Sequence, residues 1–363
     1  MLHLAANRWW TGSADPTLQL VAGLRERGHR VLLGIVPGDR FEAKAREAGL
    51  ELVEGLRLDT RSLPLDLRRL RRSIAAAGVD VVHAHHSHDH WLALLGRPRL
   101  SGGRRPALVR TFHNLRAVKR GGPAAALYRR TAAVFAVSHQ IETRCHEVGI
   151  APDRVFWIPG VVDLPRFAGP ADPAPVRDEF KLGRAPVIVS VSRLAPNRGH
   201  EALLAGFRRL LGAMPEARLL LVGKGETRPK LEQLVADLGL AERVIFTGYR
   251  ERDLPLVLAA ADCFALMATG SDESCRAALE AMAAGRAVVA RRVGALPETV
   301  VHGETGLLLD DDQPEAVASA LAAVLADPAR ARAMGAAGQR RVEETFTPRH
   351  SLDIVERVYR SLA

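Results

Sequence analysis

The chain has 363 residues, of which 47% are hydrophobic, so its length suggests two domains and its composition excludes a disordered protein. Every apolar run is shorter than the roughly 18 residues of a membrane span, and the N-terminal segment lacks a secretion-signal pattern, so we expect a cytoplasmic protein. The three cysteines are far apart, which argues against a disulfide framework and against a cysteine zinc site.

The formal charge of the chain is +10, and all of the positive excess lies in its first half. Residues 1–170 carry 26 Lys and Arg against 15 Asp and Glu, a net +11, whereas residues 171–363 carry 25 against 26, a net −1. Residues 67–74 (LRRLRRSI) would form part of a basic helix. This asymmetry predicts an anionic partner such as a membrane surface or a glycolipid. Nucleic acid is not expected, because only 5% of residues are aromatic and no recognition motif is present. A solvated arginine-rich face is the alternative.

Predicted strands and helices alternate along the first half. Strands are expected at 2–6, 30–35, 50–53, 79–84, 107–112, 134–138 and 155–158, and helices at 17–27, 41–48 and 65–77. This alternation predicts an open parallel sheet covered on both faces, with ligands at the carboxyl ends of its strands. Gly12, after the first strand, and His113, directly after 107–112, lie at such ends. Turn chemistry at Gly12 and a structural role for His113 are the alternatives.

A histidine-rich run, HAHHSHDH, occupies residues 83–90. Its composition could suggest a metal site. The run begins at a strand end and continues into a helix, however, so its side chains should point in several directions. We therefore expect a polar wall of the site here, without a metal.

A proline-punctuated stretch, residues 160–186, marks the expected domain boundary. Beyond it, strands are predicted at 187–191, 218–222, 243–247, 262–267, 287–290 and 307–309, and helices at 201–211 and 254–261. Arg193 and Arg198 follow the first of these strands, where two guanidiniums can hold a diphosphate. Two merely exposed arginines are the alternative.

The next two strands end in similar loops. Gly223 and Lys224 lie in a glycine loop that suits a close backbone approach to a ligand, and Tyr249 follows the strand after it. The glycine loop matches neither a Walker A loop nor the GxGxxG fingerprint, which disfavours a P-loop ATPase and a simple dinucleotide dehydrogenase.

Residues 270–285 (GSDESCRAALEAMAAG) combine two carboxylates with a helix N-terminus. Residues 271–274 include capping types, residues 275–284 favour a helix, and Gly285 fits the C′ position. Asp272 should therefore lie in the loop before the helix, and Glu280 on its body. The free N–H groups between them attract a phosphate, and a carboxylate remains on either side for hydroxyls. An ordinary surface helix is the alternative.

Several motifs, in this order, resemble glycosyltransferase family 4. The second half contains SRLAPNRG (192–199), LLLVGKGE (219–226), TGYRERDLPLVLAAADCFAL (247–266), the helix of Glu280, and VGALPETVVHGETGLLL (293–309). The first half matches more loosely through GHRV (28–31), DVVHAH (80–85), AVS (136–138) and IPGVVDLPRF (158–167). The resemblance covers nearly the whole chain.

The resemblance implies the GT-B fold, an α/β architecture of two Rossmann-like doubly wound domains facing a central cleft. Residues 1–165 would bind the acceptor, residues 166–346 would bind the donor, and a final helix at about 347–363 would pack back on the first domain. The implied enzyme is a retaining hexosyltransferase that needs no metal or cofactor. It would move a sugar from a UDP or GDP donor to a glycan or glycolipid, in cell-surface polysaccharide or lipopolysaccharide synthesis at the inner face of the cell membrane.

The resemblance also implies roles for single residues. Glu280 would bind the ribose, Asp272 would lie by the sugar and diphosphate, and Arg193 and Arg198 would stabilise the leaving diphosphate. His113 would lie near the sugar. The remaining donor-binding assignments are Gly12, Gly223, Lys224, Tyr249, and the region of Ser274, Cys275 and Arg276.

The chain departs from the family pattern at four places. Asp272 replaces a Glu, Arg198 replaces a Lys, residues 273–275 (ESC) replace Gly-Phe-Gly, and residues 158–163 (IPGVVD) lack the common Asn-Gly. A subfamily variant is expected, with the donor sugar in question. The alternatives are a sugar-nucleotide epimerase or phosphorylase of the same fold, and a non-catalytic nucleotide-sugar binding protein.

Overall fold

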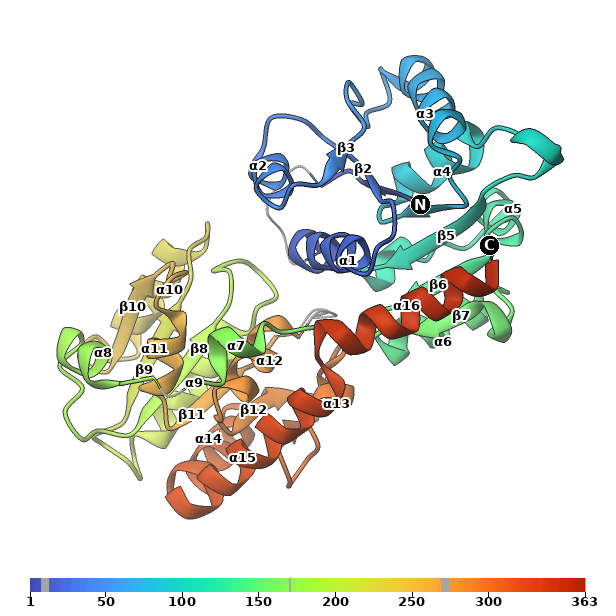
Figure 1. The fold of residues 1–363 in the computed structure, drawn as a ribbon. Helices are drawn as coiled ribbons and strands as arrows, with labels where there is room; N and C mark the ends of the chain where they lie inside the picture. The colour runs from blue at the N-terminus through green and yellow to red at the C-terminus, as the bar shows by residue number, and fades with distance from the viewer. Residues whose placement is uncertain (8–12, 170, 269–274, 363) are drawn as a thin grey trace. The chain divides into compact units, whose positions relative to one another are not determined.

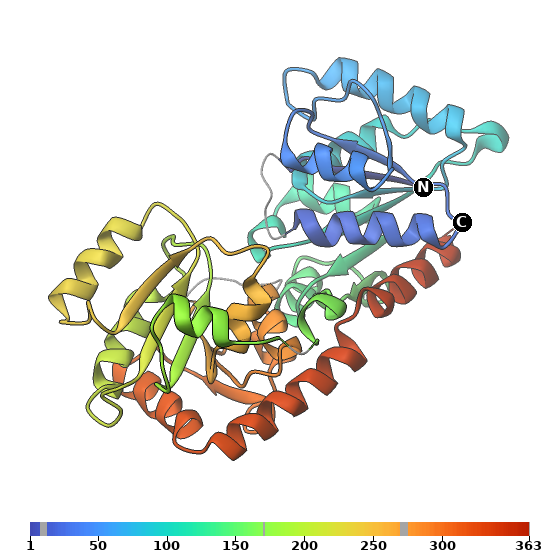
Figure 2. The same ribbon diagram turned by 60° about the vertical axis from the view of Figure 1, so that its left-hand side comes forward.

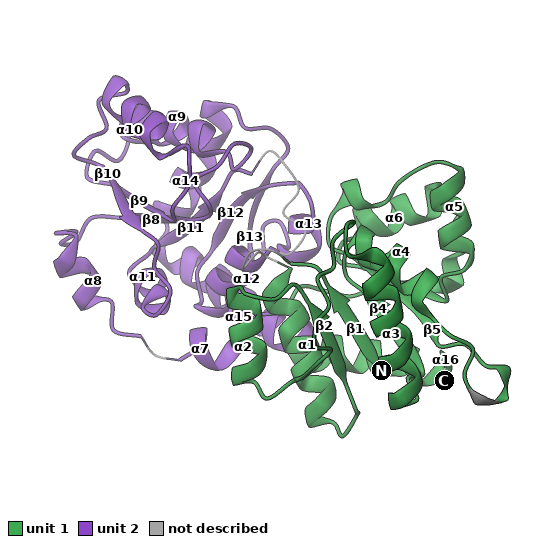
Figure 3. Ribbon diagram, turned by 90° about the horizontal axis from the view of Figure 1, so that it is seen from above, with its two compact units in different colours: residues 1–161, 348–363 green, residues 162–347 purple. Residues whose placement is uncertain are grey.

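The computed structural model describes residues 1–7, 13–169, 171–268 and 275–362. The chain forms two compact units (Figure 3). Unit 1 comprises residues 1–161 and 348–363, and unit 2 comprises residues 162–347. The units divide at 161/162, where the sequence suggested 165/166, and the C-terminal helix belongs to unit 1.

Unit 1 is built on a seven-stranded parallel sheet with the order β3-β2-β1-β4-β5-β6-β7. Its strands are β1 Leu2–Ala5, β2 Leu32–Ile35, β3 Glu51–Leu52, β4 Val81–Ala84, β5 Ala107–Phe112, β6 Ala133–Ala136 and β7 Val155–Trp157. Its α-helices are α1 Ala14–Glu26, α2 Arg40–Glu47, α3 Leu63–Ala77, α4 Ser87–Gly96, α5 Gly122–Arg129, α6 His139–Glu147 and α16 Pro348–Leu362.

Alternate strand residues of unit 1 pack against different helices. Val81 and Val109 belong to a buried cluster with residues of α1, α2 and α16. Their sequence neighbours Val82 and Leu108 belong to a second cluster, with residues of α3, α4 and α6. Because successive strand side chains point to opposite faces, this pattern gives a sheet covered on both sides, which confirms the doubly wound prediction.

The C-terminal helix α16 completes one face of unit 1. Its buried residues include Leu352, Val355 and Tyr359, which share one side of a helix. It packs beside α1, as Figures 1 and 2 show. A Cβ at Gly23 of α1 would lie 2.4 Å from Leu352 Cδ1, so a glycine there permits the close approach. Residues at opposite ends of the chain thereby share one core.

Unit 2 contains a six-stranded parallel sheet with the order β10-β9-β8-β11-β12-β13. Its strands are β8 Val187–Val191, β9 Arg218–Val222, β10 Val244–Gly248, β11 Cys263–Leu266, β12 Val288–Arg291 and β13 Gly306–Leu309. Its helices are α7 Leu164–Phe167, α8 Ala174–Glu179, α9 His200–Leu210, α10 Arg228–Asp237, α11 Leu254–Ala259, α12 Arg276–Ala283, α13 Leu296–Thr299, α14 Pro314–Leu325 and α15 Pro328–Thr345.

Both sheets reverse their strand order once, between β1 and β4 in unit 1 and between β8 and β11 in unit 2. In open parallel sheets the carboxyl ends of the strands at such a reversal form the usual ligand site. No helix in the described part of the chain combines the length and the apolar character that a membrane crossing requires.

Candidate active site

Most of the predicted donor-binding residues of unit 2 lie at the carboxyl ends of its central strands. Arg193 follows β8, Gly223 and Lys224 follow β9, and Tyr249 follows β10. Glu280 lies on α12, the helix after β11. The predicted residues Asp272 and Ser274, and Gly12 of unit 1, lie outside the described residues.

The loop between β8 and α9 carries the two predicted phosphate-binding arginines. Arg193 is exposed and its Nη2 lies 2.9 Å from Glu226 Oε2, while Arg198 is half-buried just before α9. Gly199, the N-cap of α9, has φ +72°, and a Cβ there would lie 1.6 Å from Met267 O. The position of Arg198 therefore depends on a residue that only glycine can fill without a shift of the backbone.

The glycine loop after β9 packs against the loop after β8. A Cβ at Gly223 would lie 1.9 Å from Ser192 O, and Leu194 N donates to Lys224 O at 3.1 Å. The missing side chain at Gly223 thus lets two loop backbones meet. Lys224 Nζ lies 5.1 Å from the ring centre of Tyr249, whose side chain is about half exposed. This pair offers a cation and an aromatic face beside the loop.

Helix α12 holds a buried carboxylate close to its first turn. It begins at Arg276 after the N-cap residue Cys275, whose φ of +44° is left-handed, and Gly285 follows the C-cap residue Ala284. Glu280 is only 5% exposed, and Arg276 Nε donates to its Oε1 at 2.8 Å. An ion pair fixes this carboxylate at the carboxyl edge of the sheet, where it can accept hydrogen bonds from ligand hydroxyls.

A histidine that the sequence did not single out supports the arginine loop. His200, the first residue of α9, is buried, and its Nε2 lies 2.9 Å from Ser192 Oγ. Burial, and then the positive charge of Arg198, lowers the pKa of His200 to about 4, so its ring is neutral near pH 7. Its position directly after the glycine of SRLAPNRG was the available signal.

In unit 1, the predicted site residue His113 ends a chain of buried hydrogen bonds. His113 Nε2 lies 3.1 Å from His85 Nδ1, and His85 Nε2 lies 3.1 Å from His3 Nδ1. Tyr359 OH of α16 lies 3.4 Å from His3 Nε2 and also bonds His83 Nδ1. The chain joins β1, the ends of β4 and β5, and the C-terminal helix.

The hydrogen-bond donors among these residues can be assigned by starting from the middle of the series, at His85. Thr17 donates its hydroxyl proton to Ser13 O at 2.8 Å, so Thr17 Oγ1 can only accept at its 3.3 Å contact with His85 Nδ1. His85 Nδ1 therefore carries a proton, and its Nε2 accepts from His3 Nδ1. His3 Nε2 is then the acceptor for the hydroxyl of Tyr359.

The donors and acceptors of the remaining hydrogen bonds follow from these assignments. The single proton of Tyr359 is committed to His3, so His83 Nδ1 donates to the Tyr359 oxygen and His83 Nε2 accepts from Thr111, 2.7 Å away. At the other end, His85 Nδ1 also donates to His113 Nε2, which leaves the proton of neutral His113 on Nδ1. The hydrogen bonds thus select one tautomer of His113.

Burial keeps these rings neutral. It lowers the pKa of His3 to about 3 and holds the pKa values of His83 and His85 well below the usual range. The pKa of His113 is also held well below its usual value, first by burial and then by His86 and Arg110. His113 is consequently an uncharged hydrogen-bonding group near pH 7.

The histidine-rich run does not act as one unit. Within it, His83 lies in β4, His85 and His86 lie in the following loop, and His90 lies in α4, where its Nε2 meets Thr131 Oγ1 at 2.9 Å. Nitrogen atoms of His3, His83 and His85 come within 4.8 Å of one another. The rings of His83 and His85 are stacked, however, with centres 4.3 Å apart and planes 24° apart. Their in-plane lone pairs cannot converge on one ion, so this geometry suits a hydrogen-bonded chain better than a metal site.

Two family models match the chain. The model described as "Glycosyl transferases group 1" matches residues 176–341, and the model described as "Glycosyltransferase Family 4" matches residues 11–166.

The chain is similar to a GDP-mannose-dependent alpha-(1-6)-phosphatidylinositol monomannoside mannosyltransferase of Mycobacterium tuberculosis. The two are 35% identical over 317 residues, and this match covers 83% of this chain and 81% of that protein. This chain is 40% identical over 190 residues to the protein of the same name from Mycolicibacterium smegmatis, which covers 50% of each. A 2-deoxystreptamine glucosyltransferase of Streptomyces kanamyceticus is 33% identical over 239 residues, or 65% of this chain and 59% of that protein.

Solved structures share the fold at low identity. Anabaena Alr3699/HepE in complex with UDP matches with a TM-score of 0.86 and 21% identity, over 99% of both chains. A glycosyltransferase from Rickettsia africae matches with a TM-score of 0.87 and 18% identity, over 99% of this chain and 97% of that one. These likenesses confirm the predicted GT-B fold, and with the family models and the relatives they identify this chain as a glycosyltransferase of family 4.

Proposed function

We propose that this protein is a retaining hexosyltransferase that uses GDP-mannose, or a closely related sugar nucleotide, and a phosphorylated glycolipid acceptor. The observation that carries the proposal is the 35% identity to a GDP-mannose-dependent phosphatidylinositol monomannoside mannosyltransferase over most of both chains. The polar groups at the carboxyl edge of the unit 2 sheet, described above, supply the chemistry that a sugar nucleotide needs.

The donor nucleotide would lie along this edge. Glu280, buried and fixed by Arg276, is suited to accept the hydrogen bonds of a ribose diol. The exposed ring of Tyr249 beside Lys224 offers a stacking face for the base. Gly223 and the first turn of α12, from Cys275 and Arg276, would place backbone N–H groups near the phosphates.

Two arginines would replace the metal ion that many transferases use. Cleavage of the sugar–phosphate bond builds negative charge on the leaving diphosphate, and Arg193 and Arg198 can donate forked hydrogen bonds to it. Arg193 now pairs with Glu226 on the surface, a contact that a diphosphate would displace. Asp272 by the sugar, Ser274 and Gly12 by the diphosphate, and neutral His113 by the sugar complete the proposed site.

The acceptor would be a lipid at the cytoplasmic face of a membrane. Helix α3 exposes Arg68, Arg69, Arg71 and Arg72, together with Leu65, which is 57% exposed. A basic face with an exposed apolar residue suits an anionic bilayer surface. The mycobacterial relatives favour a phosphoinositide acceptor over lipopolysaccharide, because the lipopolysaccharide enzymes among the solved structures are only 15% and 16% identical and inform the fold alone.

A transfer assay tests the proposal directly. The protein is incubated with radiolabelled GDP-mannose or UDP-glucose and with phosphatidylinositol lipids, in the presence and absence of EDTA. We expect labelled lipid with GDP-mannose, unaffected by EDTA, and an α-linked product. Free sugar nucleotide converted to its epimer, or sugar 1-phosphate formed from a glycan and phosphate, would instead support the epimerase or the phosphorylase alternative.

Variants separate catalysis from mere binding. Arg198→Ala should still bind donor but lose about 10²–10³ in turnover, the usual cost of one charge-stabilising donor. Glu280→Ala should weaken nucleotide binding. A protein that binds donor with full affinity yet transfers nothing to any acceptor, before and after the Arg198 change, would indicate a non-catalytic binding protein.

The surface role has its own test. Sedimentation with anionic liposomes should capture the wild-type protein at low salt and release it as salt rises. A variant with Arg68 and Arg72 changed to Glu should remain in the supernatant. No capture of the wild type at low salt would refute the membrane assignment.

A further inference from the structure

A buried arginine in unit 1 has no ionic partner among the residues that the structure describes. The side chain of Arg110, on β5, is 1% exposed, and its Nε and Nη1 have no hydrogen-bond partner among the described residues. Burial lowers its pKa to about 10, which still leaves it charged near pH 7. Its ring contact is with Phe112, whose centroid lies 4.9 Å from the guanidinium carbon.

The nearby acid Asp89 offsets part of the charge of Arg110 without pairing with it. Asp89 favours the charged form of Arg110 electrostatically, but within the described ranges Arg110 forms no ion pair. The Oδ2 atom of Asp89 instead accepts from the backbone N–H groups of Ala6 and His86, both at 3.0 Å. A buried guanidinium is normally paired, so an unpaired one needs a reason.

Arg110 lines a cavity of about 320 Å³ between α4 and α5. Two further cations line the same cavity, Lys119 and Arg120, of which Arg120 also pairs with Glu147, and none of the described residues that line it is acidic. Its other walls are largely aromatic or apolar, and include Trp91, Phe112 and Leu127. Such walls lower the local dielectric and strengthen attraction between the cations and an anion.

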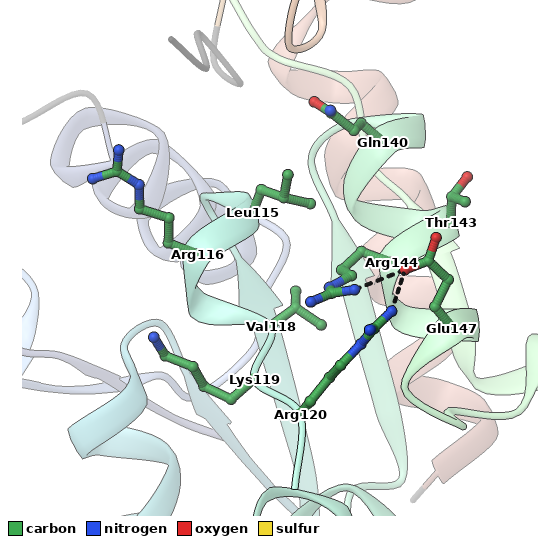
Figure 4. Close-up of a pocket in the computed structure, with 9 residues that line it drawn as sticks. All are labelled: Leu115, Arg116, Val118, Lys119, Arg120, Gln140, Thr143, Arg144 and Glu147. Atoms are coloured by element: carbon green, nitrogen blue, oxygen red, sulfur yellow. Dashed lines mark hydrogen bonds and ion pairs between the residues drawn. The ribbon is translucent and has the colours of Figure 1, made fainter.

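A neighbouring cavity provides a useful contrast. It has about 630 Å³ and shares Lys119 and Arg120 (Figure 4). There Arg120 and Arg144 both bond Glu147 Oε2, at 3.2 and 2.8 Å, so part of its positive charge is already neutralised. The smaller cavity is therefore the better anion site.

Apolar groups continue outward from the smaller cavity. Trp91 lines it and is 39% exposed, and Leu95, one turn further along α4, is 48% exposed. Arg71 of the basic helix α3 donates to Leu95 O at 3.0 Å, so the cavity and the basic face lie on packed helices. An anion bound at Arg110 would have apolar surface close by.

We propose that the Arg110 cavity binds the phosphoryl group of an anionic lipid acceptor, with the Arg110 guanidinium donating to its oxygens and Trp91 and Leu95 contacting its apolar part. A planar guanidinium with two unpartnered N–H donors matches phosphate oxygens well. This inference rests on the proposed function and deepens it, because it specifies how the acceptor is recognised.

Binding measurements on the whole chain test the proposal. Glycerophosphoinositol, inorganic phosphate, and neutral vesicles with or without phosphatidylinositol are titrated into wild-type protein, Arg110→Met and the control Arg144→Met. We expect glycerophosphoinositol and phosphatidylinositol vesicles to bind the wild type, with affinity reduced about tenfold or more in Arg110→Met and little changed in Arg144→Met. Inorganic phosphate should bind more weakly, with the same dependence on Arg110.

Thermal unfolding shows whether Arg110 has a merely structural role. Removal of an unpaired buried charge should leave the melting temperature of the free protein unchanged or raised, and should abolish the shift caused by glycerophosphoinositol. Equal affinity in Arg110→Met and wild type, or no binding of any lipid headgroup by the wild type, would overturn the proposal. Binding of inorganic phosphate alone would overturn the lipid assignment.

A parallel titration with GDP distinguishes a failure of the proposed donor function from a failure of the Arg110 cavity assignment. If GDP fails to bind while glycerophosphoinositol binds in an Arg110-dependent manner, the donor function is wrong and the cavity assignment stands. If GDP binds and the headgroup result is negative, the reverse holds.

Discussion

The buried histidines of unit 1 should make this half of the protein sensitive to mild acid. His3, His83, His85 and His90 are at most 2% exposed, and burial lowers the pKa of each well below 6.5, to about 3 for His3. In the unfolded chain each would titrate near its ordinary value. Below pH 6.5 the unfolded state therefore binds more protons than the folded state, and the free energy of unfolding falls as the pH falls.

The magnitude follows from linkage. One pH unit below the unfolded pKa, a histidine that stays neutral in the folded state lowers stability by about 1.4 kcal/mol. Four such residues together lower it by about 5–6 kcal/mol, comparable with the whole stability of many domains. Unit 2 has His200 as its corresponding buried residue, so it should lose less.

Urea denaturation at several pH values between neutral and mildly acidic measures the effect. We expect the transition of unit 1 to move to lower urea as the pH falls, while that of unit 2 moves less. His90→Gln can still bond Thr131. It should reduce the loss of unfolding free energy on acidification by the contribution of one histidine, about 1.4 kcal/mol one pH unit below the unfolded pKa. His146→Gln, at an exposed position of α6, is the matched control. A free energy of unfolding that does not change below pH 6.5 would refute the reasoning.

Three further predictions concern particular contacts. Tyr359→Phe should remove the far end of these hydrogen bonds yet leave the proton of His113 on Nδ1, because Thr17 still fixes His85, as ¹⁵N shifts of histidine-labelled protein report; a mixture of the two neutral tautomers would contradict the assigned direction. The same variant should lose about 2–3 kcal/mol of stability in urea denaturation, because two buried ring nitrogens lose their partner; a loss below the error of the fit would mean that the hydroxyl is not so placed. Gly199→Ala should unfold well below wild type in a thermal melt and lose turnover, because the new Cβ meets Met267 O, whereas Gly183→Ala, with φ +53° and open space, should cost only about 1 kcal/mol; equal melting temperatures would contradict this.

Local signals in the sequence predicted much of the fold. The strands at 107–112, 187–191 and 218–222 have the expected bounds, because each is an apolar run between turn residues. Because His113 and Arg193 come soon after two of these strands, the sequence also placed them at the carboxyl edges of their sheets, where open parallel sheets usually bind ligands.

Long-range contacts were not predictable in the same way. The bond between His83 and Tyr359 joins residues 276 positions apart, and no local pattern indicates it. The sequence likewise offered Gly223 as a glycine for close ligand approach, whereas its lack of a side chain is required by Ser192 O of a neighbouring loop. Arg110 looked like an ordinary residue of a strand, and only tertiary packing shows that it is buried without a partner.

The roles proposed for Asp272, Ser274 and Gly12 stay predictions, as they lie outside the described residues. Their assignment comes from the family resemblance and from the capping pattern before α12. The role of Asp272 can be tested with Asp272→Asn, which should lower turnover and leave nucleotide affinity unchanged.

A thermal-shift panel with GDP, UDP, ADP, NAD, GDP-mannose and UDP-glucose, on wild-type protein and Glu280→Ala, tests the central claim most directly. A ligand at about 100 times its dissociation constant stabilises a protein by roughly 2.7 kcal/mol, which such an assay resolves. We predict a selective shift with GDP and GDP-mannose that the Glu280 change reduces. No shift with any nucleoside diphosphate, or a shift with NAD alone, would contradict the proposed donor site.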